Sequence, residues 1–113
     1  MGYAEDKAQA LKLHCKERIA ASLRRKAKKG AVRFLEQRAK ELENEISRAC
    51  MRALRNYNDG MKTTALMKKA GNSARVVEAY KQALKSGFDA NLKFQRESLK
   101  RFAEFCARLK RAQ

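Results

Sequence analysis

The chain has 113 residues, and 28 lysines and arginines against 12 acidic residues give it a formal net charge of +16 at pH 7. This length suits a single domain, and a hydrophobic fraction of 44% is enough for a small core. Proline is absent and only five glycines occur, so turn signals are too sparse for a β-sandwich or a Rossmann fold. No apolar run approaches the length that spans a membrane. We therefore expect one basic, all-α domain over residues 1–113.

The first predicted helix covers residues 4–29. Apolar residues recur in it every three or four positions and form one stripe: Ala8, Leu11, Cys15, Ile19, Leu23 and Ala27. Its last turns are rich in lysine and arginine, which suits the negative end of the helix dipole. Gly30 is then expected to end the helix as its C′ residue.

The second predicted helix covers residues 31–57 and has the clearest heptad pattern in the chain. Its apolar positions alternate steps of four and three, like a coiled-coil seam: Leu35, Ala39, Leu42, Ile46, Ala49 and Ala53. We expect this seam to pack on itself or on a neighbouring protein. Turn-forming residues then predict a break after the helix: Asn56, Asn58, Asp59 and Gly60.

Three shorter helices are predicted over residues 62–70, 74–86 and 89–111. Gly71 ends the first of them, and Asn72 or Ser73 is the expected N-cap of the second. Gly87 is expected to end that helix and Asp89 to cap the last one. The fold class is thus a helical bundle or stacked helical hairpins, in which a long hairpin at about 4–57 precedes C-terminal helices at about 62–111.

Catalytic and metal-binding patterns are weak. The three cysteines are far apart and lack a C-x-x-C pair, which favours buried, reduced thiols in an intracellular protein. His14 adjoins Cys15, but neighbouring residues point about 100° apart on a helix, so we interpret both as structural. We expect no enzymatic activity, no metal and no cofactor. Without a secretory signal, the expected location is mitochondrial or cytoplasmic.

Two basic clusters are the candidate polyanion-binding sites. The first comprises Arg24, Arg25, Lys26, Lys28 and Lys29, and the second comprises Arg96, Lys100, Arg101, Arg108, Lys110 and Arg111. Both suit contacts with phosphate groups.

Aromatic residues are interleaved with the second cluster. Leu92, Leu99, Phe102, Cys106 and Leu109 share a face of the last predicted helix, and Phe94 and Phe105 widen it. Phe94, Phe102 and Phe105 are compatible with a base-stacking platform, but an aromatic core with solvated cations is the favoured interpretation.

Two segments resemble known families. Residues 66–71 followed by 74–91 resemble the helix–turn–helix rhythm of one pentatricopeptide-type repeat, which implies a pair of helices. The basic run at 16–29 leading into the seam at 35–53 resembles the first hairpin of the ESCRT-III core. That second resemblance implies filaments on anionic membranes.

Charge and helical pattern together suggest a partner class. The first hypothesis is a non-catalytic RNA-binding protein of a large, ribosome-like ribonucleoprotein, which recognises backbone and shape without reading sequence. The alternative is an accessory subunit of a multi-protein complex, for example a mitochondrial membrane assembly. Its basic faces would then meet acidic subunits or anionic lipid headgroups.

Overall fold

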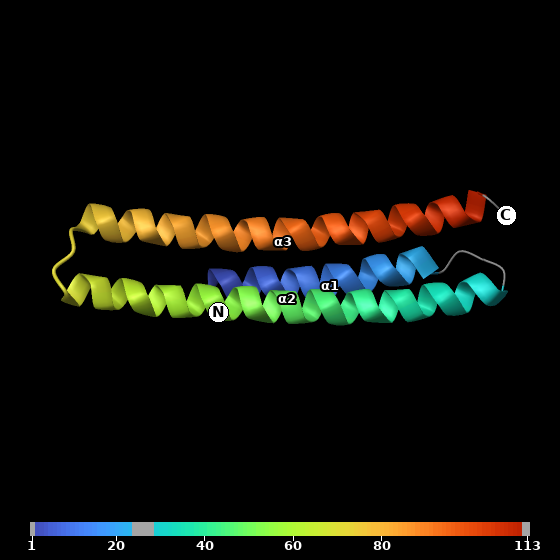
Figure 1. The fold of residues 1–113 in the computed structure, drawn as a ribbon, viewed down its shortest axis with the longest axis horizontal. Helices are drawn as coiled ribbons and strands as arrows, with labels where there is room; N and C mark the ends of the chain where they lie inside the picture. Colours follow the sequence, from blue (N-terminus) through green and yellow to red (C-terminus); the bar gives the residue numbers. More distant parts are fainter. Residues whose placement is uncertain (1, 24–28, 112–113) are drawn as a thin grey trace.

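A computed structural model describes residues 2–23 and 29–111, except for the side chains of 29–32. Three α-helices account for this part of the chain: α1 (Tyr3–Leu23), α2 (Lys29–Lys69) and α3 (Ala74–Arg111). They lie side by side in a rod with extents of 64 × 18 × 18 Å (Figure 1). The all-α prediction is confirmed, whereas the predicted two long and three shorter helices are wrong.

The shortest helix, α1, covers only part of the rod. It packs against both long helices near the α1–α2 connection, and its N-terminus lies beside the middle of α2 (Figure 1). There the Tyr3 hydroxyl meets Asp89, about midway along α3. Beyond Tyr3 the rod continues as the α2–α3 hairpin alone, toward the turn that contains Gly71.

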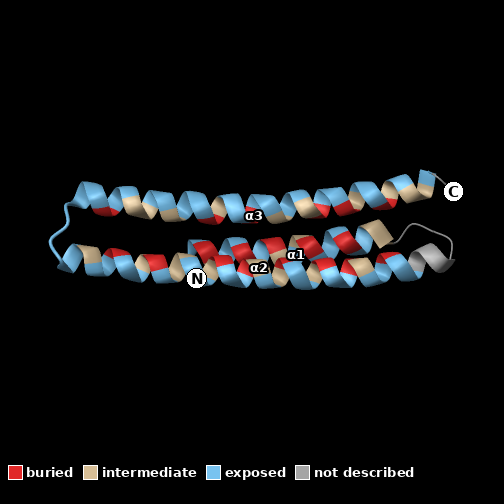
Figure 2. Ribbon diagram, in the orientation of Figure 1, coloured by how far each residue is buried: buried red, intermediate tan, exposed pale blue. Residues whose placement is uncertain are grey.

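One hydrophobic core joins the three helices. Its buried residues are Ala4, Ala8, Leu11, Cys15 and Ile19 of α1, Leu35, Ala39, Leu42, Ile46, Cys50 and Ala53 of α2, and Phe88, Leu92, Leu99, Phe102 and Cys106 of α3. These positions face the neighbouring helices (Figure 2). The predicted α2 seam is wrong at one position: Ala49 is half-buried, and its neighbour Cys50, which the prediction left out, is fully buried in its place. The periodic apolar stripes therefore select the faces that pack.

The predicted break at residues 56–60 is wrong, because α2 continues through it. The apolar stripe does not stop there: half-buried Tyr57, buried Gly60 and buried Thr64 continue the seam of Ala53. The Tyr57 ring packs on Phe88 of α3, with 5.4 Å between ring centroids. Thr64 keeps its hydroxyl satisfied by donating to the Met61 carbonyl oxygen at 2.6 Å. Packing along the hairpin outweighs the local preference for a turn.

Gly60 has a packing role in place of the expected turn role. A Cβ at this position would lie 2.7 Å from Cδ1 of Leu84, which is shorter than a carbon–carbon contact allows, and 3.1 Å from its Cγ, which is a tight contact. The missing side chain therefore lets α2 and α3 approach closely at this level.

Three other predicted helix ends and caps are also wrong. Gly87 lies inside α3, where Leu84 and Phe88 on either side of it still face the core. Asp89 lies in the middle of α3 and is no N-cap. Gly30 belongs to the first turn of α2, so it does not end the first helix. A single glycine in a helix costs only about 1 kcal/mol, which burial of the neighbouring residues can outweigh.

The predicted turn at Gly71 is confirmed. Gly71 has a φ of +87°, which is the left-handed conformation that glycine adopts without strain. Asn72 N–H donates to the Met67 carbonyl and Gly71 N–H to the Lys68 carbonyl, both at 3.1 Å, which is a Schellman motif. Ser73 then caps α3, because its Oγ accepts from Val76 N–H at 3.3 Å.

Candidate nucleic-acid interface

The first predicted basic cluster lies largely outside the described residues. Arg24, Arg25, Lys26 and Lys28 fall in the segment 24–28, and Ala27 of the first apolar stripe falls there too. Lys29 opens α2, with a side chain that is not among those described. The role of this cluster therefore stays a prediction from the sequence.

The second cluster occupies the C-terminal part of α3, where five of its six side chains are exposed: Arg96, Lys100, Arg101, Arg108 and Arg111. Lys110 differs, because it is half-buried and its Nζ donates to the Ser22 carbonyl oxygen of α1 at 3.3 Å. That carbonyl belongs to the last turn of α1, where a cation is favourable. Lys110 thus ties the end of α1 to α3.

The exposed cations of α3 are spread over different faces. Arg101 and Arg108 are seven residues, or two turns, apart and therefore share a face. Arg96 and Lys100 are one turn apart and lie on a face nearer to α1. Ala103 shows this, because it is seven residues after Arg96, on the same face, and lines a hollow together with residues of α1. A polyanion can therefore meet cations on several sides of this helix.

The aromatic residues of α3 divide between core and surface. Phe102 is 6% exposed and belongs to the core, as the favoured interpretation predicted. Phe94 is 61% exposed and Phe105 is 38% exposed, so the expectation that they widen the core is wrong. Arg101 lies over the Phe94 ring, with its Cζ 5.9 Å from the ring centroid. Phe105 meets Phe34 of α2 edge to face, with 6.3 Å between centroids.

A shallow hollow of about 250 Å³ lies between α2 and α3 next to these rings. Phe105 and Arg101 line it from α3, and Arg38 lines it from α2. Arg38 pairs with Glu41 at 3.5 Å and Glu45 at 3.4 Å, both exposed. Sequence reasoning missed Phe34 and Arg38. Their spacing of four, off the buried seam, is the signal that places both on one outer face of α2.

A polar cluster fixes the start of α1 on α3. The Tyr3 hydroxyl donates to Asp89 at 2.8 Å, and Lys7 Nζ lies 3.1 Å from the same carboxylate. Lys85 Nζ stacks over the Tyr3 ring at 4.5 Å from its centroid. Burial raises the pKa of Asp89, but the hydrogen bonds from Tyr3 and Lys7 outweigh it and lower that pKa overall. This cluster is explained by helix packing and needs no ligand.

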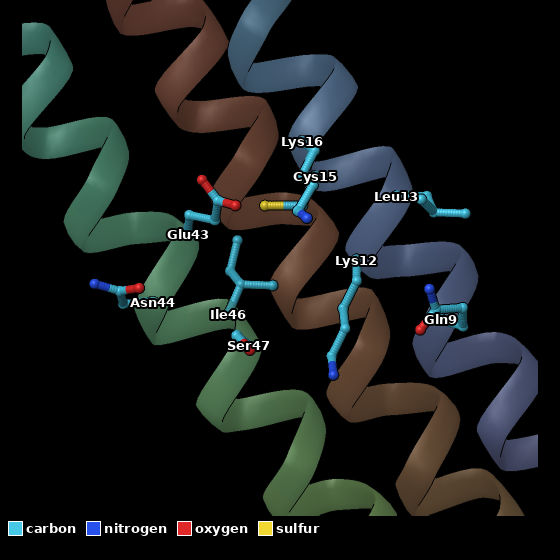
Figure 3. Close-up of a pocket in the computed structure, with 9 residues that line it drawn as sticks. All are labelled: Gln9, Lys12, Leu13, Cys15, Lys16, Glu43, Asn44, Ile46 and Ser47. Carbon is cyan, nitrogen blue, oxygen red and sulfur yellow. The ribbon is translucent and has the colours of Figure 1, made fainter.

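Another hollow, of about 420 Å³, lies between α1 and α2 (Figure 3). The Cys15 side chain points toward α2 and the Glu43 carboxylate, while Leu13, which also lines the hollow, points away from α2. Burial is the main reason that the pKa of the Cys15 thiol rises to about 11, and the nearby Glu43 charge adds to the rise. Cys15 is therefore protonated at neutral pH, which makes it a poor nucleophile.

The other two cysteines are similar. Cys50 and Cys106 are buried core residues, and desolvation raises the pKa of each thiol. His14 is half-buried and adjoins Cys15 without sharing its direction. Over residues 2–23 and 29–111 no group of three histidine, cysteine or acidic side chains is placed to hold a metal ion. Nor does any helix in those ranges have the length and hydrophobicity to cross a membrane.

Comparison with known proteins gives no further guidance, because no family model matches the chain and no curated protein or solved structure is significantly similar to it.

Proposed function

We propose that this chain is a non-catalytic, RNA-binding structural protein of a large ribonucleoprotein, which neutralises phosphates with its basic helix faces. The observation that carries the proposal is the charge balance. With 28 cations and 12 carboxylates, at least 16 cationic groups cannot be neutralised one to one within the chain. A polyanion supplies that missing charge and releases its own counterions on binding.

The shape of the molecule supports the same proposal. A rod of 64 × 18 × 18 Å exposes much surface for its volume, and its exposed cations run along the helices and around them. Such a surface can contact the phosphates of an RNA backbone that runs along the length of the rod. Contacts of lysine and arginine with phosphates carry no sequence information, so recognition by backbone and shape is expected.

The test is co-sedimentation of the native protein in a density gradient, with and without ribonuclease. We expect it to travel with a large particle and to move to the top of the gradient after RNA digestion. If it remains with a large complex after digestion, its anchor is a protein or lipid surface and the proposal fails.

Charge reversal tests the predicted residues themselves. Reversing Arg24, Arg25 and Lys28 to glutamate should weaken RNA binding strongly and flatten its dependence on salt. The matched control reverses Lys62, Lys68 and Lys69 in the C-terminal part of α2, which changes the net charge equally. An unchanged salt slope in the first variant, or an equal loss in both, would contradict the assignment of that cluster.

A second candidate function is an accessory subunit of a multi-protein complex. The observation that favours it is the α2–α3 hairpin beyond α1, where Leu66 of α2 is 64% exposed and Val76 of α3 is 49% exposed. A partner subunit that covers this end would remove apolar surface from water. Particle association that survives ribonuclease and is lost on substituting Leu66 and Val76 by serine would support this candidate.

A further inference from the structure

We propose that one outer face of the rod binds single-stranded RNA by stacking bases on phenylalanine rings beside arginine side chains. This inference deepens the proposed function and rests on it. The face is defined by Phe94, Arg101, Phe105 and Arg108 of α3 together with Phe34 and Arg38 of α2, and we call it the aromatic–arginine face.

Helix geometry brings the four α3 residues together. Steps of seven, four and three separate Phe94, Arg101, Phe105 and Arg108, which is the spacing of one helix face. Neither phenylalanine belongs to the core cluster. Single exposed apolar side chains are common on protein surfaces, but a group of exposed rings on one face marks a candidate binding surface.

Neighbouring groups hold the rings and the cations in place. Arg101 donates to Ser98 Oγ at 3.1 Å while its Cζ lies 5.9 Å from the Phe94 ring centroid. Phe105 is braced by the edge-to-face contact with Phe34 at 6.3 Å. Arg38 is held by its two glutamates, so on this face Arg101 and Arg108 are better placed to supply charge to a phosphate. Binding sites for single-stranded nucleic acids combine aromatic rings, on which bases stack, with cations that contact the phosphates.

The spacing of the rings favours a single strand over a duplex. Eleven residues separate Phe94 from Phe105, which is about 16 Å along the helix. Bases stacked in a duplex repeat every ~3.4 Å along each strand, and their faces are not open to side chains. A strand that reaches both rings must run extended, with unstacked nucleotides between the two platforms.

A second copy of this chain fits the same face poorly. Two chains of net charge +16 repel each other, and a symmetric contact here would bring Arg101 and Arg108 of both copies together. A negatively charged, planar ligand satisfies the arginines and the rings at the same time.

The test uses two full-length variants that keep every charge. Phe94→Leu/Phe105→Leu keeps apolar side chains and removes the rings, whereas Phe94→Tyr/Phe105→Tyr keeps the rings. A matched control, Met51→Ala/Leu66→Ala, removes exposed apolar surface elsewhere on α2. Affinities for a labelled oligouridylate and for a blunt RNA duplex are measured by fluorescence anisotropy at several salt concentrations.

We expect the leucine variant to bind oligouridylate about fivefold or more weakly for each ring lost. Its salt slope and its affinity for the duplex should stay unchanged, because no cation is removed. The tyrosine variant and the control should bind as the wild type does.

Equal binding of oligouridylate by the leucine variant and the wild type would overturn the inference while leaving RNA binding intact. An equal loss for the duplex would do the same. The inference would also be overturned if sedimentation showed that the wild type self-associates and the leucine variant does not, because the aromatic–arginine face would then be a protein interface. If the wild type binds neither RNA, the inference and the proposed function fail together.

Discussion

Alanine substitutions at Gly60 and Gly87 should differ in their effect on stability, although both glycines lie inside helices. Alanine has the higher helix propensity, so each substitution gains about 1 kcal/mol from the backbone alone. At Gly87 nothing lies within 4 Å of the added methyl group, so Gly87→Ala should keep this gain. At Gly60 the methyl group meets the side chain of Leu84.

The magnitude at Gly60 depends on how easily Leu84 can move. An added Cβ would be too close to both methyl groups of Leu84, which a rotation about χ2 can move away, and it would also lie 3.1 Å from Cγ, which that rotation does not move. Relieving the Cγ contact then needs a shift of a few tenths of an ångström by Leu84 or between α2 and α3. Overpacking of this kind costs about 1–3 kcal/mol. After the propensity gain, Gly60→Ala should range from neutral to about 2 kcal/mol less stable than the wild type.

Urea unfolding followed by far-UV circular dichroism measures both substitutions. We expect Gly87→Ala to exceed Gly60→Ala in unfolding free energy by at least ~1 kcal/mol. A double-mutant cycle sharpens the test, because Gly60→Ala should become stabilising when Leu84 is already alanine. If Gly60→Ala stabilises the wild type as much as Gly87→Ala does, the close approach of α2 and α3 at this level is refuted.

Three further outcomes are expected. The pKa of Asp89 is lowered in the folded state, so its carboxylate should stabilise the fold above the usual carboxyl pKa of about 3.9, and this contribution should be lost as the pH falls below that value. Asp89→Asn should therefore cost under about 1 kcal/mol near pH 7 and almost nothing near pH 2, as measured by urea unfolding at both pH values. Ile46→Ala removes a fully buried side chain from the core and should lower the free energy of unfolding by about 2–5 kcal/mol. Met51→Ala, at an exposed position, should lower it by only about 0.5 kcal/mol, and equal losses of unfolding free energy would contradict the assigned core. Burial raises the pKa of the Cys15 thiol to about 11, so its alkylation by iodoacetamide at pH 8 should be far slower in the folded protein than in urea. Peptide mass spectrometry can follow the reaction, and equal rates would show that the thiol is accessible in the folded protein.

Apolar periodicity predicted which faces pack, and the turn residues at 71–73 predicted one helix boundary, but turn signals elsewhere misplaced several helix ends. The stripe of Leu11, Cys15 and Ile19 is buried in α1, and Ser73 caps α3. Local composition predicted breaks at residues 56–60 and at Gly87, yet both segments are helical. At both places the local preference of the residues for a turn is outweighed by burial of apolar side chains between α2 and α3. A contact such as that of Tyr57 with Phe88 joins two helices, so the sequence of either helix alone does not predict it.

The candidate site was only partly predictable for the same reason. A single helix pattern groups Phe94 and Phe105 with Phe102, because spacings of eight and three residues place all three on neighbouring positions around the helix. Only the directions from which α1 and α2 approach α3 decide that Phe102 enters the core and that the other two rings remain outside. Phe34 joins Phe105 through a contact between helices, which no local pattern contains.

The charge of this rod also connects its stability to the binding of any polyanion. Sixteen excess positive charges on a body 18 Å across lie close enough to repel one another, which destabilises the free chain. A polyanion that binds only the folded rod removes this repulsion and stabilises the fold by mass action, by about 2.7 kcal/mol at a ligand concentration one hundred times Kd. Domains of this size have only about 5–15 kcal/mol of total stability, so this linkage is a substantial share of it. A basic, thin bundle of this kind is therefore expected to be most stable where its counter-charge is always present, as it is inside a ribonucleoprotein.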